Sequence, residues 1–152
     1  MTLIKKNMMA AALALAFSAP AFAADSMSKD QVKSERERIA TELKANKAKC
    51  NDLKANAKDI CMAEAQGQEK VAKAELEAKQ KDTPKARYDV VAAKADMEYN
   101  VAKEKCEDLK GDAKKACDKD AKAARDQTKN QAKAERDAAG KERTAARKTD
   151  TK

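Results

Sequence analysis

Two cysteine pairs, each with ten residues between its members, constrain this 152-residue chain more than any other feature. The first pair lies in KCNDLKANAKDIC, residues 49–61, and the second lies in KCEDLKGDAKKAC, residues 105–117. The segments are offset by 56 residues, and seven of the twelve positions from cysteine to cysteine are identical. A composition rich in lysine and alanine does not by chance place cysteines and a leucine in register. We therefore interpret the segments as units of an internal duplication.

Helix geometry restricts how these cysteines can pair. Eleven residues of helix rise about 16.5 Å, whereas a disulfide needs Cα atoms within roughly 4.4–6.8 Å of each other. One unbroken helix therefore cannot contain a bridge between the two cysteines of a unit. Two pairings remain. The crossed pairing joins Cys50 to Cys117 and Cys61 to Cys106, and the chain then turns only at Thr83-Pro84. The local pairing joins the cysteines within each unit, and the chain then turns inside both units.

Turn chemistry separates the two pairings only weakly. Gly111 suits a left-handed position after a helix, and Asp112 suits the N-cap that follows. In the first unit Asn56 is a suitable N-cap, but Ala55 is a poor residue for the left-handed position. The apolar seam through Leu109 continues without a change of phase, as it does on one straight helix. The residues themselves therefore leave both pairings open.

The repeated pattern Cys-x-Asp-Leu-x-(Gly/Ala)-(Asn/Asp)-Ala-Lys-x-x-Cys, followed by Ala65 or Ala121, resembles a group of uncharacterised exported proteins of proteobacteria. These proteins are rich in Ala and Lys, and some are labelled as cell-envelope proteins. The likeness covers roughly residues 44–124, although the group usually has Gly-Asn where this chain has Ala55-Asn56. Copy number varies in the group, which implies that each unit closes its own bridge. The resemblance thus favours the local pairing, with helices near residues 28–54, 57–82, 84–110 and 112–140.

The N-terminal residues have the pattern of a cleaved secretory signal peptide. Lys5 and Lys6 precede a short apolar run, and Ala21-Phe22-Ala23 forms a small-x-small cleavage site. The run is too short to cross a membrane. We predict a signal peptide over residues 1–23 with cleavage after Ala23, a periplasmic location, and no transmembrane segment after cleavage. In that oxidising compartment Cys50, Cys61, Cys106 and Cys117 are expected to form disulfides.

The composition after cleavage excludes an ordinary globular core. Only 16 large apolar side chains remain among 129 residues. Ala, Glu, Lys, Leu and Arg together make up 75 of the 129 residues. This bias is typical of long helices rather than sheets. We therefore predict an all-α fold of antiparallel helical hairpins, or an extended helical bundle, stapled by two disulfides over residues 24–117. Its repeat units span residues 43–65 and 99–121.

Two helix starts and a weak C-terminal region complete the predicted fold. Ser28 and Gln31 have the spacing of a capping box, and Thr83-Pro84 combines an N-cap with a proline at the first helical position. After Cys117 the only apolar side chains are alanines. We expect residues 118–152, a basic, Ala/Lys-rich helical or disordered tail, to fray.

The residues give no basis for an enzyme. Without histidine there is no Ser-His or Cys-His arrangement and no His-ligated metal site. We predict no catalytic, cofactor-binding or metal-binding residue. The predicted function is that of a non-enzymatic structural or interaction protein of the cell envelope. Its thin seams, such as Tyr88–Ala92–Ala95–Tyr99, either pack within the chain or take a protein partner or a second copy. The alternative is weak binding of a polyanion, an anionic envelope polymer or nucleic acid, by the tail, whose net charge is +4.

Overall fold

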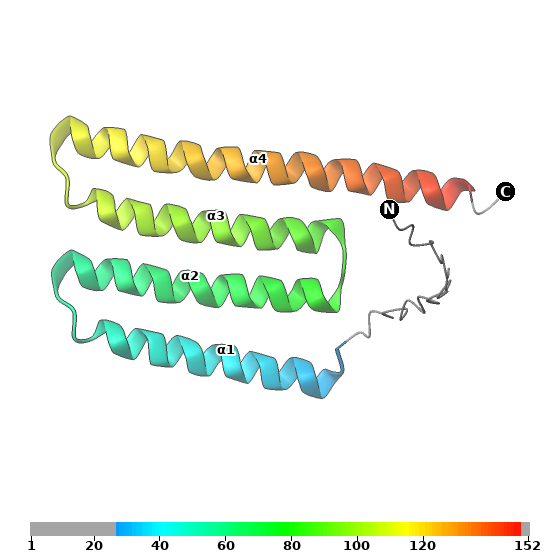
Figure 1. Ribbon diagram of the computed structural model, residues 1–152, viewed down its shortest axis with the longest axis horizontal. Coiled ribbons are helices and arrows are strands. Elements are labelled where there is room, and N and C mark those ends of the chain that lie inside the picture. Colours follow the sequence, from blue (N-terminus) through cyan, green and yellow to red (C-terminus); the bar gives the residue numbers. More distant parts are fainter. Residues whose placement is uncertain (1–26, 150–152) are drawn as a thin grey trace, which may run out of the picture.

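Four helices joined by short turns make up the computed structural model, which describes residues 27–149. They are α1 (Lys29–Cys50), α2 (Ala55–Gln80), α3 (Pro84–Cys106) and α4 (Gly111–Thr149), as Figure 1 shows. The prediction of an all-α fold of antiparallel hairpins is confirmed. The predicted signal peptide and its cleavage site lie outside the described residues.

The helices begin where the sequence predicted starts. Ser28 and Gln31 form the capping box: Ser28 Oγ accepts a hydrogen bond from the Gln31 amide at 3.2 Å, and the Ser28 amide donates to Gln31 Oε1 at 2.8 Å. Thr83 Oγ1 accepts from the Ala86 amide at 3.1 Å, and Pro84 is the first residue of α3. These caps satisfy amides that have no partner within the helix.

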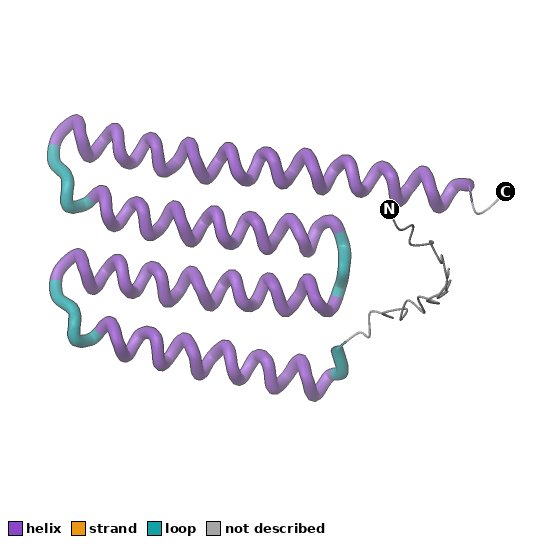
Figure 2. Tube along the Cα trace, in the orientation of Figure 1, coloured by secondary structure: helices purple, strands orange, loops and turns teal. Residues whose placement is uncertain are grey.

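The helices lie side by side in one antiparallel layer (Figure 1), and Figure 2 shows the turns alternating between its two ends. Contacts join α1 to α2, α2 to α3 and α3 to α4. Among the described residues, no Cα atoms of non-neighbouring helices lie within 8 Å of each other. The molecule is therefore an extended array with two broad faces, and no core is shared by all four helices.

The core consists of thin seams between neighbouring helices. Ile39 and Leu76 are the buried large aliphatic side chains of the described residues. The other buried side chains are small: Cys50, Ala65, Ala86, Ala95, Cys106 and Ala132. Small side chains bury little apolar area each, but they let helices approach closely. At Gly67 a Cβ atom would lie 2.1 Å from Met97 Cγ, so α2 and α3 meet where no side chain fits.

The two hairpins correspond position by position at the offset of 56 residues. Ile39 and Ala95 are both buried, and so are Leu76 and Ala132 at equivalent places in α2 and α4. Cys50 and Cys106 are both fully buried. The correspondence thus extends well beyond the cysteine units, to the seam of each hairpin.

The C-terminal region differs from the expectation of a frayed tail. Residues 118–149 are helical within α4, so fraying is not observed over them, and residues 150–152 lie outside the described residues. The Arg125 guanidinium stacks 4.3 Å from the centre of the Tyr99 ring, and Arg136 stacks 4.9 Å from that of Tyr88. Lys129 also pairs with Asp96 at 3.0 Å. Cation–π and ionic contacts thus replace the aliphatic contacts that this region lacks.

Candidate functional site

The most distinctive chemistry lies at the end of the layer that holds the α1–α2 and α3–α4 turns. Cys50 is bridged to Cys61 and Cys106 to Cys117, with Cα separations of 5.6 and 5.7 Å. The local pairing is therefore confirmed and the crossed pairing is excluded. In both hairpins the last residue of one helix is bridged to the seventh residue of the next.

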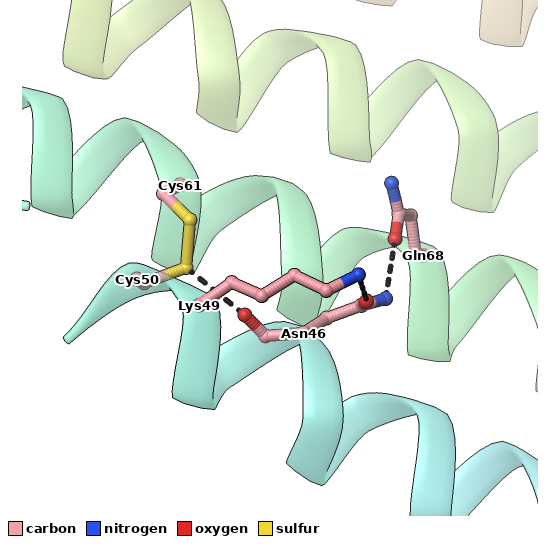
Figure 3. The surroundings of a disulfide bond; sticks show 5 residues. All are labelled: Asn46, Lys49, Cys50, Cys61 and Gln68. Atoms are coloured by element: carbon pink, nitrogen blue, oxygen red, sulfur yellow. Dashed lines mark hydrogen bonds between the residues drawn. A yellow bond between two sulfur atoms is a disulfide. The ribbon is translucent and has the colours of Figure 1, made fainter. Parts of the chain in front are cut away.

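A polar network accompanies the first bridge (Figure 3). Asn46 Nδ2 donates to Gln68 Oε1 at 3.0 Å, and Lys49 Nζ donates to Asn46 Oδ1 at 3.5 Å. The Asn46 carbonyl oxygen lies 3.3 Å from Cys50 Sγ. Because the sulfurs are bonded to each other and Cys50 is fully buried, the site offers no accessible thiolate for chemistry. The bridge is a staple between α1 and α2.

The two turns share one backbone conformation on different residues. Ala55 has φ of 50° and Gly111 has φ of 60°, which places both in the left-handed region. For alanine this conformation costs about 1–2 kcal/mol. The sequence disfavoured Ala55 here, but the bridge and the packing of the hairpin impose the conformation on it.

The predicted N-caps of the second helix in each hairpin are wrong. Asn56 and Asp112 lie inside the first turns of α2 and α4, one residue after the helix begins. The α2 N-cap is Lys54, which makes no side-chain cap hydrogen bond. Asn56 Nδ2 instead donates to the backbone carbonyl of Glu104 at 2.7 Å, near the end of α3. This bond ties the first turn to the second hairpin, and no spacing in the sequence indicates it.

The apolar seam through Leu109 does not continue as one helix but ends at the turn. Leu53 and Leu109 lie in the turns and are 40% and 41% exposed. By contrast, the seam of Tyr88, Ala92, Ala95 and Tyr99 packs within the chain, against α4. Ala95 is buried, and the rings of Tyr88 and Tyr99 lie under arginines of α4.

Basic side chains collect on one broad face of the layer. A groove between α1 and α2 is lined by Arg36 and Lys73, and a groove between α2 and α3 is lined by Lys70, Asn100 and Lys103. Helical spacing places two more cations on this face: Lys33 lies three residues before Arg36, and Lys122 lies seven before the lysine that pairs with Asp96. We define the basic face by Lys33, Arg36, Lys70, Lys103 and Lys122. Within residues 27–149 none of the five forms an ion pair.

Acidic side chains on this face are largely neutralised by neighbours. Five ion pairs hold them, within one helix or between adjacent helices: Glu69–Lys73, Glu77–Lys81, Asp89–Lys85, Asp96–Lys129 and Asp137–Lys133. Asp59 and Glu104, which line the α2–α3 groove with Lys70 and Lys103, form no ion pair within the described residues. The unpaired carboxylates balance Lys70 and Lys103 in that groove, but over the whole face the five cations outnumber them.

The opposite broad face carries charges of both signs, because Lys49, Lys79 and Lys105 form no ion pair within the described residues and share that face with unpaired glutamates. Glu64 lines a groove with Lys49 between α1 and α2, and Glu135 lines one with Arg87 between α3 and α4. Lys94, which pairs with Glu75 at 2.9 Å across α2 and α3, lies on this side too. We define the acidic face by Glu64, Glu98, Glu135 and Glu142, placing Glu98 and Glu142 by their spacing from Lys94 and Glu135. None of the four forms an ion pair in the described part of the chain.

The shifted pKa values all favour the charged form of the group. A hydrogen bond from Arg38 lowers the pKa of Glu35, and one from Arg136 lowers the pKa of Asp137. A hydrogen bond to Asp89 raises the pKa of Lys85. These are surface ion pairs, whereas a general acid or base at neutral pH needs a shift in the other direction.

Within residues 27–149 no cluster of three or more His, Cys, Asp or Glu residues is placed to hold a metal ion. No helix there has the length and hydrophobicity to span a membrane. Protein-family models, curated proteins and solved structures gave no match to this chain. Fold and site together define an all-α protein of two disulfide-stapled helical hairpins.

Proposed function

We propose that this chain is a non-enzymatic structural or interaction protein of the cell envelope, exported to the periplasm. The observation that supports this function is the open single layer, whose two broad faces differ in their balance of charge. Compared with a closed bundle, such a layer presents a large surface for its number of residues. Rigid staples at one end fix the relative positions of the helices on that surface.

Several features of the charged groups support a role without catalysis. Most carboxylates lie on exposed helix faces, and no polar or charged side chain of the described residues is buried as a whole, although Asp118 Oδ1 is a buried atom without a hydrogen-bond partner. The resolved pKa shifts stabilise charges in surface pairs. These groups therefore act in packing and recognition, in which surface charge determines the choice of partner.

Polyanion binding by the tail alone receives less support. Arg125 and Arg136 cover tyrosine rings of α3, and Lys129 pairs with Asp96. Arg143 Nη2 donates to the Asp82 carbonyl at 2.9 Å, in the α2–α3 turn. These four cations are engaged within the chain, which reduces the charge that the tail offers to a partner.

Cell fractionation combined with peptide mapping tests the proposed function. We expect the protein in the osmotic-shock fluid, beginning at Ala24, with the two local disulfides recovered in non-reducing maps. A photo-reactive residue at position 70, on the basic face, is expected to cross-link to an envelope component, and one at position 123, on the outer edge of α4, is not. Reduced protein in the cytosol, or equal cross-linking from both positions, contradicts the proposal.

A further inference from the structure

The cations of the basic face are spread over two dimensions. Lys33 and Arg36 lie in the first third of α1, at the end of the layer that holds the α2–α3 turn, whereas Lys103 lies three residues before Cys106 at the opposite end. Lys70 and Lys122 are on α2 and α4. With a rise of 1.5 Å per residue, α1 to α3 are about 33–39 Å long and α4 is about 58 Å long, and neighbouring axes 8–10 Å apart place α4 about 24–30 Å from α1. A rod-like polymer meets one row of these cations, but a flat partner meets them all.

The face offers charge without groups for insertion or stacking. The exposed large hydrophobic residues of the described chain are Leu53 and Leu109, and both lie in the turns. The rings of Tyr88 and Tyr99 lie under arginines in the α3–α4 seam. Stacking on nucleic acid bases needs free aromatic faces, and anchoring in acyl chains needs exposed apolar side chains. The basic face therefore fits a partner that is recognised by negative charge alone.

We propose that the basic face docks this protein flat on a bilayer with anionic lipid headgroups, with the acidic face turned away. The inference rests on the proposed function and names the partner of the envelope protein. A bilayer surface is planar and negatively charged, so it matches the cations in both arrangement and sign. A second copy could set its acidic face against the basic one, but the chain keeps a net charge of +6 (32 basic and 26 acidic residues) after the predicted cleavage, which opposes self-association.

The size of the electrostatic attraction follows from the number of cations. Each Lys or Arg near an anionic membrane raises the partition coefficient about fivefold, so three contribute about a hundredfold. The attraction weakens within a Debye length, which shortens as salt is added. Docking is therefore peripheral, reversible and steeply dependent on salt.

Cosedimentation of the oxidised chain with vesicles tests the proposal. The vesicles are phosphatidylcholine alone or phosphatidylcholine with about one third phosphatidylglycerol, in about 50 or 200 mM salt. The test variant is Lys33→Gln/Lys70→Gln/Lys103→Gln on the basic face. Its matched control, Lys49→Gln/Lys79→Gln/Lys105→Gln, removes the same charge from the other side of the layer. All six side chains are exposed, so circular dichroism is expected to show both variants folded.

We expect binding to the anionic vesicles at low salt and its loss at high salt. The basic-face variant is expected to bind about a hundredfold more weakly, and the control less than about fivefold. Equal losses in the two variants, or equal binding to neutral vesicles, overturn the proposal. If the protein binds soluble polyphosphate but not vesicles, the basic face binds a polymer instead of a bilayer. If the protein forms a dimer that the basic-face variant does not form, the face binds a second copy. Failure with vesicles leaves the proposed function standing if the protein is periplasmic and bridged, whereas cytosolic, reduced protein removes both.

Discussion

The two hairpins have the same staple and the same turn but are held together differently. In both turns the leucine amide donates to the carbonyl of the buried cysteine, at 3.2 Å from Leu53 to Cys50 and at 3.0 Å from Leu109 to Cys106. The α1–α2 seam buries Ile39 and Leu76, whereas the α3–α4 seam has alanines and arginine-covered tyrosines. The bridge and the turn therefore define the hairpin, and aliphatic, cation–π or ionic contacts can complete it.

The residues at the turns differ in how firmly they attach to the rest of the layer. Asn56 bonds to the end of α3, so the first turn is held from both sides. Its equivalent, Asp112, has a 98% exposed side chain that pairs with Lys115 within its own helix. The first turn thus contains a strained alanine and an external tie, and the second has a permissive glycine and no equivalent tie.

Removing the bridges is expected to have the largest effect and to break the equivalence of the hairpins. Each double variant, Cys50→Ser/Cys61→Ser or Cys106→Ser/Cys117→Ser, is expected to lose about 3 kcal/mol of unfolding free energy. Loss of the first bridge should release all of α1, which contacts only α2. Loss of the second should release α4 only near Gly111, because its arginines hold α3. Hydrogen exchange resolved by helix measures this difference. The prediction is contradicted if α4 exchanges faster along its whole length in the second-bridge variant than α1 does in the first-bridge variant.

A methyl group at Gly67 tests the contact between the hairpins. Gly67→Ala places a Cβ 2.1 Å from Met97 Cγ and 2.8 Å from its Cβ, so the helices must move apart. We expect a loss of about 1–2 kcal/mol in urea unfolding, with recovery in the double variant Gly67→Ala/Met97→Ala. The equivalent position is Ala123, on an exposed edge. Ala123→Val is expected to change stability by less than about 0.5 kcal/mol.

Exchanging the residues at the left-handed positions sharpens the comparison of the turns. Gly111→Ala is expected to lower the unfolding free energy by about 1 kcal/mol, and Ala55→Gly to raise it by a similar amount. Urea midpoints of the two variants measure the effect. Gly140→Ala is the control, because this helical glycine has no atom within 4 Å of an added Cβ. It is expected to stabilise by up to about 1 kcal/mol, and stabilisation by Gly111→Ala as well would contradict the strain argument.

The tie from the first turn predicts a smaller difference. Asn56→Ala removes the donor to Glu104 and is expected to cost about 1 kcal/mol. Asp112→Ala removes only an exposed ion pair and is expected to have almost no effect. Thermal unfolding of the two variants side by side measures the contrast, and equal effects would show that the tie contributes nothing.

Changes of pH are expected to have the smallest effect and to act on the hairpins unequally. The lowered pKa values of Glu35 in α1 and Asp137 in α4 contribute stability at neutral pH that is lost as the pH falls below about 4.5 and 3.8 respectively. The raised pKa values of Lys85 and Lys114 contribute stability that is lost above about pH 10.5. Both lysines belong to the second hairpin. Alkaline pH should therefore destabilise the α3–α4 hairpin more than the α1–α2 hairpin. Hydrogen exchange at alkaline pH, corrected for the intrinsic exchange rate, measures this difference.

Much of the fold could be predicted because local chemistry determines it. Ser28 and Thr83 cap helices as their spacing indicates, and the four cysteines are all bridged. The choice between pairings could not be made from the residues. The period of the seam through Leu109 is unchanged by a four-residue turn, and Ala55 adopts a conformation that its side chain disfavours. Each bridge supplies a covalent constraint between neighbouring helices that outweighs both of these preferences.

The surface properties were less accessible from the sequence. In the sequence, positive and negative residues are interleaved, which indicates only a solvated helix surface. The arrangement of the helices in a layer determines which of these residues share a face. Lys70 and Lys103 lie 33 residues apart but line one groove. The expectation that the tail frays rests on its lack of large apolar side chains. Its helix instead packs through Arg125 and Arg136, which stack on Tyr99 and Tyr88 of α3.

The consecutive pairing of the cysteines has a consequence for how the chain matures. For a polypeptide that crosses a membrane N-terminus first, Cys61 is the first thiol to arrive after Cys50, and Cys117 follows Cys106 in the same way. Each native bridge therefore forms between the two newest thiols, and the first hairpin can be oxidised before the second emerges. Such a chain reaches its native bridges without a reshuffling step, so its maturation need not wait on disulfide isomerisation, which takes seconds to hours.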